Sequence, residues 1–145
     1  MTKDGALALV VAATEQWAAD PESDVVWAGE YDGRRGIRMA QACRDFTTVW
    51  FDVGERTVGF EAYVLPRPPH ADAEFYRHCM VRNWRSWPAH LATDDRGDLF
   101  VIGRIPLSDL NEATLDGAVG AIYQTIELSF RPLLRLGFQH REKSN

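Results

Sequence analysis

A chain of 145 residues, of which 46% are hydrophobic and 26% charged, has the length and composition of one globular domain. A domain of this size buries roughly 68–70% of the surface of its unfolded chain, so it needs no disulfide or metal for stability. The net charge of −5 is spread along the sequence, which argues against nucleic acid as a partner, because proteins that bind nucleic acid usually present a basic face.

The amino-terminal segment, Lys3 to Ala19, is predicted to form a helix. Its apolar residues recur at spacings of three and four, as on one face of an amphipathic helix, and Pro21 ends the pattern. The apolar run is too short to span a bilayer, and Asp4 precedes it where a signal peptide has a basic start. Cys43 and the later Cys79 form no metal or redox motif. We therefore expect a cytoplasmic protein with reduced thiols and no membrane partner.

The next part of the chain alternates apolar and polar residues with the period of two that is typical of strands. These segments are 25–31, 37–43, 47–53 and 58–65. The last two form a predicted hairpin around Gly54-Glu55-Arg56, and we expect the rest of the chain to be organised around it. The periodicity leaves open whether residues 36–53 are one bent strand or two, and counting them as one gives three strands before the next helix.

The second half of the chain begins with three prolines between Leu65 and Pro69, which end the sheet. Helical periodicity then predicts a helix over 71–84, and two strands follow at 90–93 and 99–105. The last predicted helix runs from Glu112 to Phe130, with a short extra turn through Leu136 and a polar tail over 139–145. The order α-β-β-β-α-β-β-α predicts an α+β fold with helices packed on an antiparallel sheet.

Several short motifs are similar to those of actinobacterial YbjN-domain proteins. They are Thr48-Val49-Trp50 followed by Val53-Gly54-Glu55, Arg67-Pro68, Arg82-Asn83, the stretches DRGDL (95–99) and GRIPL (103–107), and Leu136-Gly137-Phe138. The order of the elements resembles that of type III secretion chaperones. The resemblance implies a single domain over residues 1–138 with a type III secretion chaperone-like fold. It also implies a non-enzymatic, chaperone-like or regulatory domain that binds a peptide or protein, with a homodimer as a possible assembly.

No catalytic, metal or cofactor signature stands out. The histidines at positions 70, 78, 90 and 140 lack zinc-ligand spacing, and the acidic turn 94–98 lacks the glutamate that completes a calcium loop. Nucleophile-elbow and phosphate-loop motifs are absent. Residues 82–87 (RNWRSW) interleave arginine and tryptophan, as some nucleic-acid-binding segments do, but a helix end with arginines matched to its dipole is the favoured interpretation. We therefore predict no catalytic residue, no metal and no cofactor.

Two functional hypotheses follow. In the first, the chain is a binding module whose sheet face contacts a protein or peptide partner. Its predicted contact residues are Trp27, Met39, Trp50 and Tyr63. In the second, a curved sheet and the last helix enclose a small-molecule pocket or an active site. Its candidate residues are Glu61, His90 and Arg104. The first hypothesis is favoured because no acid, base or nucleophile stands out.

Overall fold

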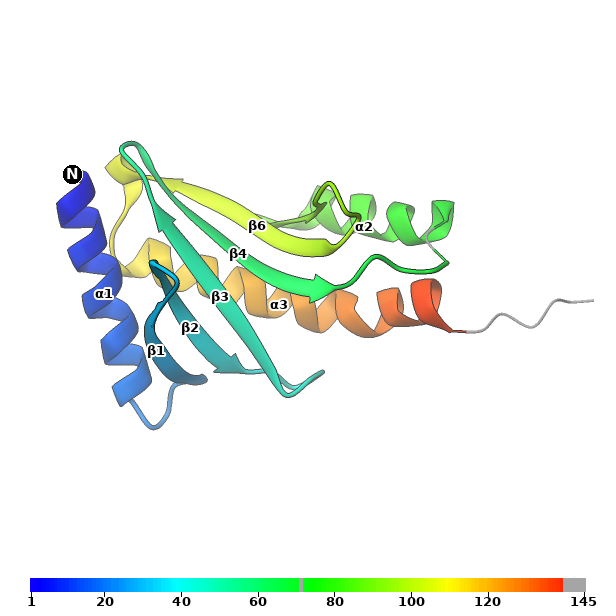
Figure 1. The fold of residues 1–145 in the computed structure, drawn as a ribbon, viewed down its shortest axis with the longest axis horizontal. Helices are drawn as coiled ribbons and strands as arrows, with labels where there is room; N and C mark the ends of the chain where they lie inside the picture. The colour runs from blue at the N-terminus through cyan, green and yellow to red at the C-terminus, as the bar shows by residue number, and fades with distance from the viewer. Residues whose placement is uncertain (71, 140–145) are drawn as a thin grey trace, which may run out of the picture.

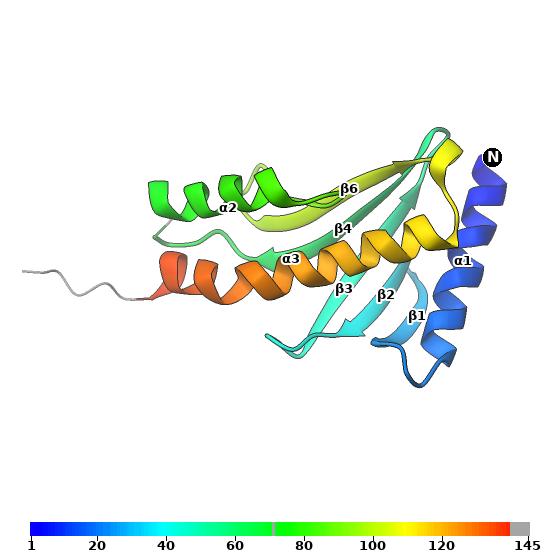
Figure 2. The same cartoon turned by 180° about the vertical axis from the view of Figure 1, so that it is seen from behind.

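Three helices lie against one side of a six-stranded antiparallel sheet, and the other side of the sheet is left uncovered (Figures 1 and 2). The computed structural model describes residues 1–70 and 72–139. His140 and the predicted polar tail, apart from Gln139, lie outside the described residues. The predicted α+β class with an antiparallel sheet is confirmed.

The bounds of the elements are close to those predicted. The helices are α1 (Lys3–Ala19), α2 (Ala73–Arg85) and α3 (Glu112–Phe138), and a short 3-10 helix (Leu107–Asp109) precedes α3. The strands are β1 (Val25–Tyr31), β2 (Arg34–Ala40), β3 (Phe46–Val53), β4 (Thr57–Leu65), β5 (His90–Thr93) and β6 (Leu99–Pro106). They lie side by side in the order β1-β2-β3-β4-β6-β5. β1 and β5 are therefore the edges of the sheet.

Residues 36–53, which the periodicity did not assign to one strand or two, are divided between β2 and β3. The connection between these strands is held by Glu127 of α3. The Glu127 carboxylate accepts hydrogen bonds from the side chain of Gln41 at 2.7 Å and from the amides of Ala42 and Cys43 at 2.8 and 3.0 Å. The connecting residues thus bind to a helix instead of extending a strand, and four strands precede α2.

Helix α3 continues past its predicted end at Phe130 as a single helix through Pro132. Its last turns are fixed by packing. A Cβ atom built on Gly137 would lie 2.6 Å from Pro68 and 3.0 Å from the ring of Phe75. Only glycine allows this close approach, and the packed contacts hold the part of the helix that follows Pro132.

The core lies between the helices and the covered side of the sheet. Its strand residues alternate in burial, as Val49 and Phe51 do in β3. Met39 has the same orientation as Ile37 in β2 and is 1% exposed. The expectation that Met39 lies on a surface open to a partner is therefore corrected: this side chain packs under the helices.

Candidate functional site: the uncovered face of the sheet

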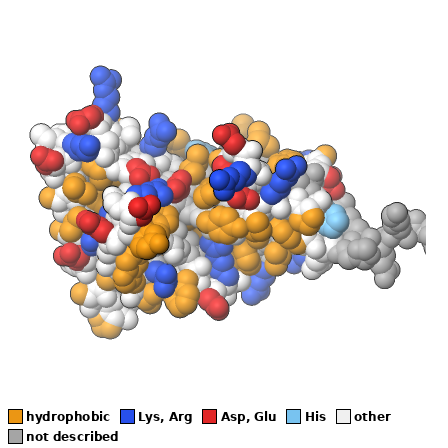
Figure 3. Space-filling view, viewed as in Figure 1, with side chains coloured by type: hydrophobic (Ala, Val, Ile, Leu, Met, Phe, Trp, Pro, Cys, Tyr) orange, Lys and Arg blue, Asp and Glu red, His pale blue; other side chains and the backbone are white. Residues whose placement is uncertain are grey.

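The uncovered face of the sheet carries a series of aromatic and apolar side chains that are exposed or half-buried (Figure 3). Strand alternation directs them to this side, because the neighbouring residues along each strand fill the core. They are Trp27, Tyr31, Phe46, Trp50, Tyr63, Phe100 and Ile102. The most exposed is Tyr31, at 71%. A gathering of exposed apolar side chains rimmed by polar ones is typical of a binding surface.

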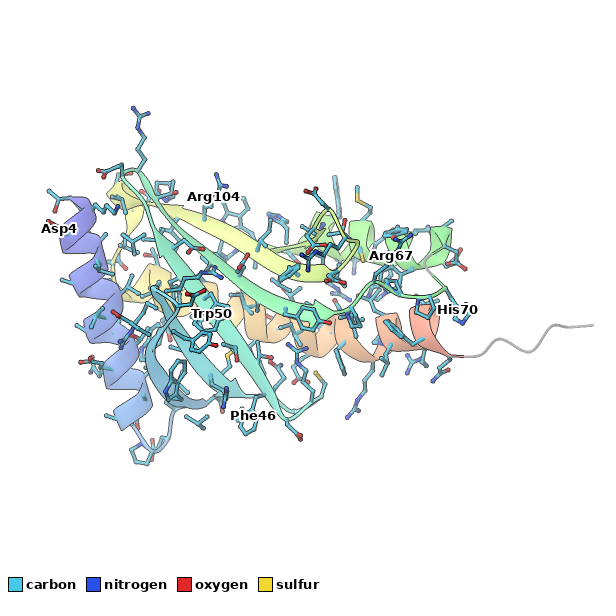
Figure 4. The ribbon with its side chains drawn as sticks, viewed as in Figure 1. Asp4, Phe46, Trp50, Arg67, His70 and Arg104 are labelled. Carbon is cyan, nitrogen blue, oxygen red and sulfur yellow. The ribbon has the colours of Figure 1, made fainter. Side chains whose placement is uncertain are left out.

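Trp50 lies near the middle of this face, between Phe46 at the start of β3 and Arg104 on β6 (Figure 4). Its cross-strand partner in β2 is Gly36. A Cβ atom built on Gly36 would lie 2.6 Å from the Trp50 ring, so the indole rests directly on the glycine backbone. The ring of Tyr31 stands beside it, with centroids 6.3 Å apart. A glycine opposite a tryptophan thus provides a flat aromatic platform on the sheet.

Trp27 also lies against a glycine, in this case Gly29, two residues further along its own strand β1. A Cβ atom built on Gly29 would lie 2.7 Å from the Trp27 ring. Gly29 and Gly36 are directly paired across β1 and β2, so the two glycines that support the indoles are neighbours. Between the two indoles lies a shallow depression of about 360 Å³, also lined by Glu30, Tyr31, Arg38 and Thr48.

A polar cluster borders the platform. The Arg34 guanidinium donates to both carboxylate oxygens of Asp52, at 3.0 and 2.7 Å, and to Glu61 at 2.8 Å. The same guanidinium stands 5.6 Å from the centroid of the Trp50 ring, which is within the range of a cation–π contact. The side-chain hydrogen bond to Asp52 is the main cause that raises the pKa of Arg34. These exposed pairs add little to stability, but they fix where the positive charge lies relative to the indole.

A second aromatic pair lies on the same face, on strands β4 and β6. The rings of Tyr63 and Phe100 meet edge to face with centroids 5.7 Å apart, and the two residues are direct cross-strand partners. Tyr63 is 45% exposed. The uncovered face thus has aromatic groups on both sides of the Arg34 cluster.

Three of the four predicted contact residues, Trp27, Trp50 and Tyr63, lie on this face, and Met39 lies on the opposite side of the sheet. The structure adds residues that the sequence reasoning missed. They are Tyr31, Phe46, Phe100 and Ile102. Tyr31 could have been found, because it has the same parity as Trp27 within one uninterrupted strand.

The residues of the alternative hypothesis do not all come together. Glu61 and Arg104 line a surface cleft of about 370 Å³ over β3, β4 and β6. His90 is not among the lining residues, and its ring packs against Trp87 at 5.9 Å. The Glu61 carboxylate is engaged by Arg34.

Helix α2 presents a second apolar surface on the other side of the molecule. Its outward side chains Met80, Val81 and Trp84 are exposed, Trp84 by 88%, with Arg77 beside them.

No group of three or more acidic, histidine or cysteine side chains within residues 1–70 and 72–139 could hold a metal ion. In that same part of the chain, each helix is too short or too polar to cross a membrane.

Relatives with similar sequences are found in mycobacteria. The uncharacterized protein ML2442 of Mycobacterium leprae (strain TN) is 30% identical over 93 residues, which cover 64% of this chain and 50% of the relative. The uncharacterized protein Rv0487 of Mycobacterium tuberculosis (strain ATCC 25618 / H37Rv) is 31% identical over 87 residues, 60% of this chain and 48% of the relative. The chain therefore spans about half the length of these relatives.

Solved structures with a similar fold include chains of two protein–protein complexes. One is a chain of the heterodimeric complex ExoU-SpcU from the type III secretion system of Pseudomonas aeruginosa, with a TM-score of 0.58, 15% identity, and coverage of 86% of this chain and 96% of that chain. Another is a chain of the ExsC-ExsE complex, with a TM-score of 0.61, 14% identity, and coverage of 87% and 94%. The predicted type III secretion chaperone-like fold is confirmed.

A family model matches residues 10–135, which is most of the chain. The family, YbjN, carries the description "Putative bacterial sensory transduction regulator". The match includes all six strands and most of the three helices. The chain therefore belongs to the YbjN family.

Proposed function

We propose that this chain is a non-enzymatic, chaperone-like module that binds a segment of another protein across the uncovered face of its sheet. The observation that carries the proposal is the aromatic platform: Trp50 and Trp27 rest on paired glycines and present their rings on a side of the sheet that has no helix. The proposal is supported by the two solved chains of similar fold, because each comes from a complex of two proteins.

A polypeptide segment suits this surface better than a small molecule does. Small-molecule sites are concave and enclose most of the ligand, whereas the depression between the indoles is shallow. Tryptophan, tyrosine and arginine are the side chains that contribute most at protein interfaces. Trp50, Tyr31 and Arg38 would receive apolar side chains and carbonyl groups of an extended segment. Cytoplasmic location is part of the same proposal.

Homodimer formation through α2 is a second element of the proposal. If two copies pack their α2 helices antiparallel about a point between Met80 and Val81, Arg77 of one copy faces Trp84 of the other, twice. A two-fold interface must be self-complementary in this sense, and an arginine over a tryptophan ring is favourable. This pairing would cover the exposed apolar side chains of α2 and leave the uncovered face of the sheet free.

Two tryptophan variants separate these surfaces. Peptides selected from a displayed library on the wild-type protein are expected to bind Trp50→Ala at least about tenfold more weakly, because a central aromatic anchor is a typical hot spot. Trp84→Ala removes a tryptophan of equal size from α2 and is expected to retain peptide affinity. Light scattering is expected to show a dimer for Trp50→Ala and a monomer for Trp84→Ala. Equal peptide affinity of all three proteins would refute binding on the sheet.

A further inference from the structure

A cleft between the end of α2 and the middle of α3 gathers hydrogen-bond donors without acids. It has a volume of about 260 Å³ and is lined by Arg82, Arg85, Ser86, Trp87, Ala121, Gln124, Thr125 and Leu128. The two helices lie alongside each other on the side of the sheet away from the aromatic platform (Figure 2). No acidic residue is among those lining residues, although the whole chain carries a net charge of −5.

The hydroxyls of Ser86 and Thr125 in this cleft donate to backbone carbonyls of their own segments, but four larger donors are unused within the described part of the chain. Arg82 and Arg85 have no ion pair there, and neither the Gln124 amide nor the Trp87 indole N–H has an acceptor. The Nε atom of Arg82 is shielded from solvent and lacks a partner. A guanidinium that is partly removed from water without a counter-charge is unfavourable, and an anion bound in the cleft would supply that counter-charge.

The neighbouring His78 responds to this uncompensated charge. Its Nε2 atom is also buried without a partner. Burial lowers the pKa of His78, and the positive charge of Arg82 lowers it further. The dipole of α2 explains arginines near the carboxyl end of the helix, but it does not explain their convergence with Gln124 of another helix on one cleft.

We propose that this cleft binds a small phosphate monoester, with Arg82 and Arg85 on the phosphate oxygens and Trp87 stacked on the organic group. Arginine matches phosphate through its fork of N–H donors. The volume lies just below the roughly 300–1,000 Å³ of sites for drug-sized ligands, which suits a small molecule. The Trp87 ring is 82% exposed at the rim, where an aromatic or sugar group attached to the phosphate would lie.

Calorimetric titration of the full chain with inorganic phosphate and with phenyl phosphate tests the site. Both are expected to saturate, and phenyl phosphate is expected to bind more tightly through Trp87. Arg85 is exposed, so Arg85→Gln is expected to leave the fold intact. It is expected to weaken the binding of both ligands about tenfold or more, as loss of a charged hydrogen bond does. Arg82→Gln should do the same, with circular dichroism to verify folding.

The matched control is Arg96→Gln, an exposed arginine in the turn before β6 that does not line the cleft. Its affinity for both ligands is expected to equal that of the wild type. Trp87→Ala is expected to remove only the advantage of phenyl phosphate over phosphate. Absence of saturation, or an equal loss for Arg96→Gln, overturns the site. Much tighter binding of a phosphotyrosine peptide than of phenyl phosphate overturns the assignment to a small molecule.

Discussion

The side chain of Asn83, in the last turn of α2, pairs with the backbone of Leu91 in edge strand β5. Its Oδ1 accepts the Leu91 amide at 2.7 Å, and its Nδ2 donates to the Leu91 carbonyl at 2.9 Å. The amide of one asparagine thereby takes the place of a neighbouring strand at the edge of the sheet. This double hydrogen bond connects α2 to β5 and gives Asn83 a structural role.

Replacing this asparagine tests its structural role. Asn83→Ala leaves the half-buried amide and carbonyl groups of Leu91 without their hydrogen-bond partners. We expect it to lower the free energy of unfolding by about 1–3 kcal/mol. Denaturant titration followed by circular dichroism measures the change. Gln16→Ala on the exposed side of α1 removes an amide that faces water, and its midpoint is expected to stay close to that of the wild type. Equal midpoints for both variants would contradict the structural role of Asn83.

The platform under Trp50 gives a second prediction. Gly36→Ala would place a Cβ atom 2.6 Å from the indole, so the ring must lift from the sheet and become more exposed. We expect a red shift in Trp50 fluorescence, measured as the difference from the same variant carrying Trp50→Phe. Gly59→Ala lies in β4, and its Cβ would be 3.8 Å from the nearest atom, so the emission should not change. A shift of the same size in both variants would be incompatible with the platform.

Two glycines of α3 should respond oppositely to alanine. Gly137→Ala forces a Cβ atom into Pro68 and Phe75 and is expected to destabilise the protein by about 1–3 kcal/mol, the usual cost of overpacking. Gly120→Ala meets no atom within 4 Å and is expected to stabilise the helix by up to about 1 kcal/mol. Thermal unfolding of the two variants provides the comparison. A loss of stability in Gly120→Ala would contradict the open space beside this glycine.

The Glu127 contact with the β2–β3 connection predicts a pH dependence of stability. Burial works to raise the pKa of Glu127, but hydrogen bonds from Gln41 and from the amides of Cys43 and Ala42 outweigh it and lower the pKa below its ordinary value. The carboxylate therefore stabilises the fold above the ordinary pKa of glutamate, and this contribution is lost as the pH falls through the lowered pKa.

Glu127→Gln tests this dependence. Denaturant midpoints measured from neutral to acidic pH are expected to be lower for the variant at neutral pH and to approach those of the wild type in acid. Glu55→Gln changes an exposed glutamate for which we expect no such difference. A gap between wild type and Glu127→Gln that persists unchanged in acid would count against the charge as its cause.

The sequence was sufficient where the structure depends on local periodicity. The alternation of Val49, Trp50 and Phe51 placed Trp50 on the side of its strand opposite Val49 and Phe51, and the helical spacing located all three helices. It was insufficient where distant residues meet. The break between β2 and β3 depends on Glu127, more than 80 positions along the chain from its partners.

Met39 shows the same limit within the candidate site. Alternation fixed which residues of β2 share a side, but only the pairing of β2 with β3 shows that Met39 lies beside Thr47 in the core while Gly36 supports Trp50. The register between strands depends on packing against α3 and α1, which a single sequence does not display.

The division of each strand between two sides has a consequence for how such proteins can diversify. In β3, Val49 and Phe51 secure the fold, whereas Thr48 and Trp50 face outward and can be exchanged with little effect on the interior. Selection on ligand preference can therefore proceed at alternate positions while the scaffold is inherited intact. A new partner requires new side chains on one side of the layer, not a new architecture.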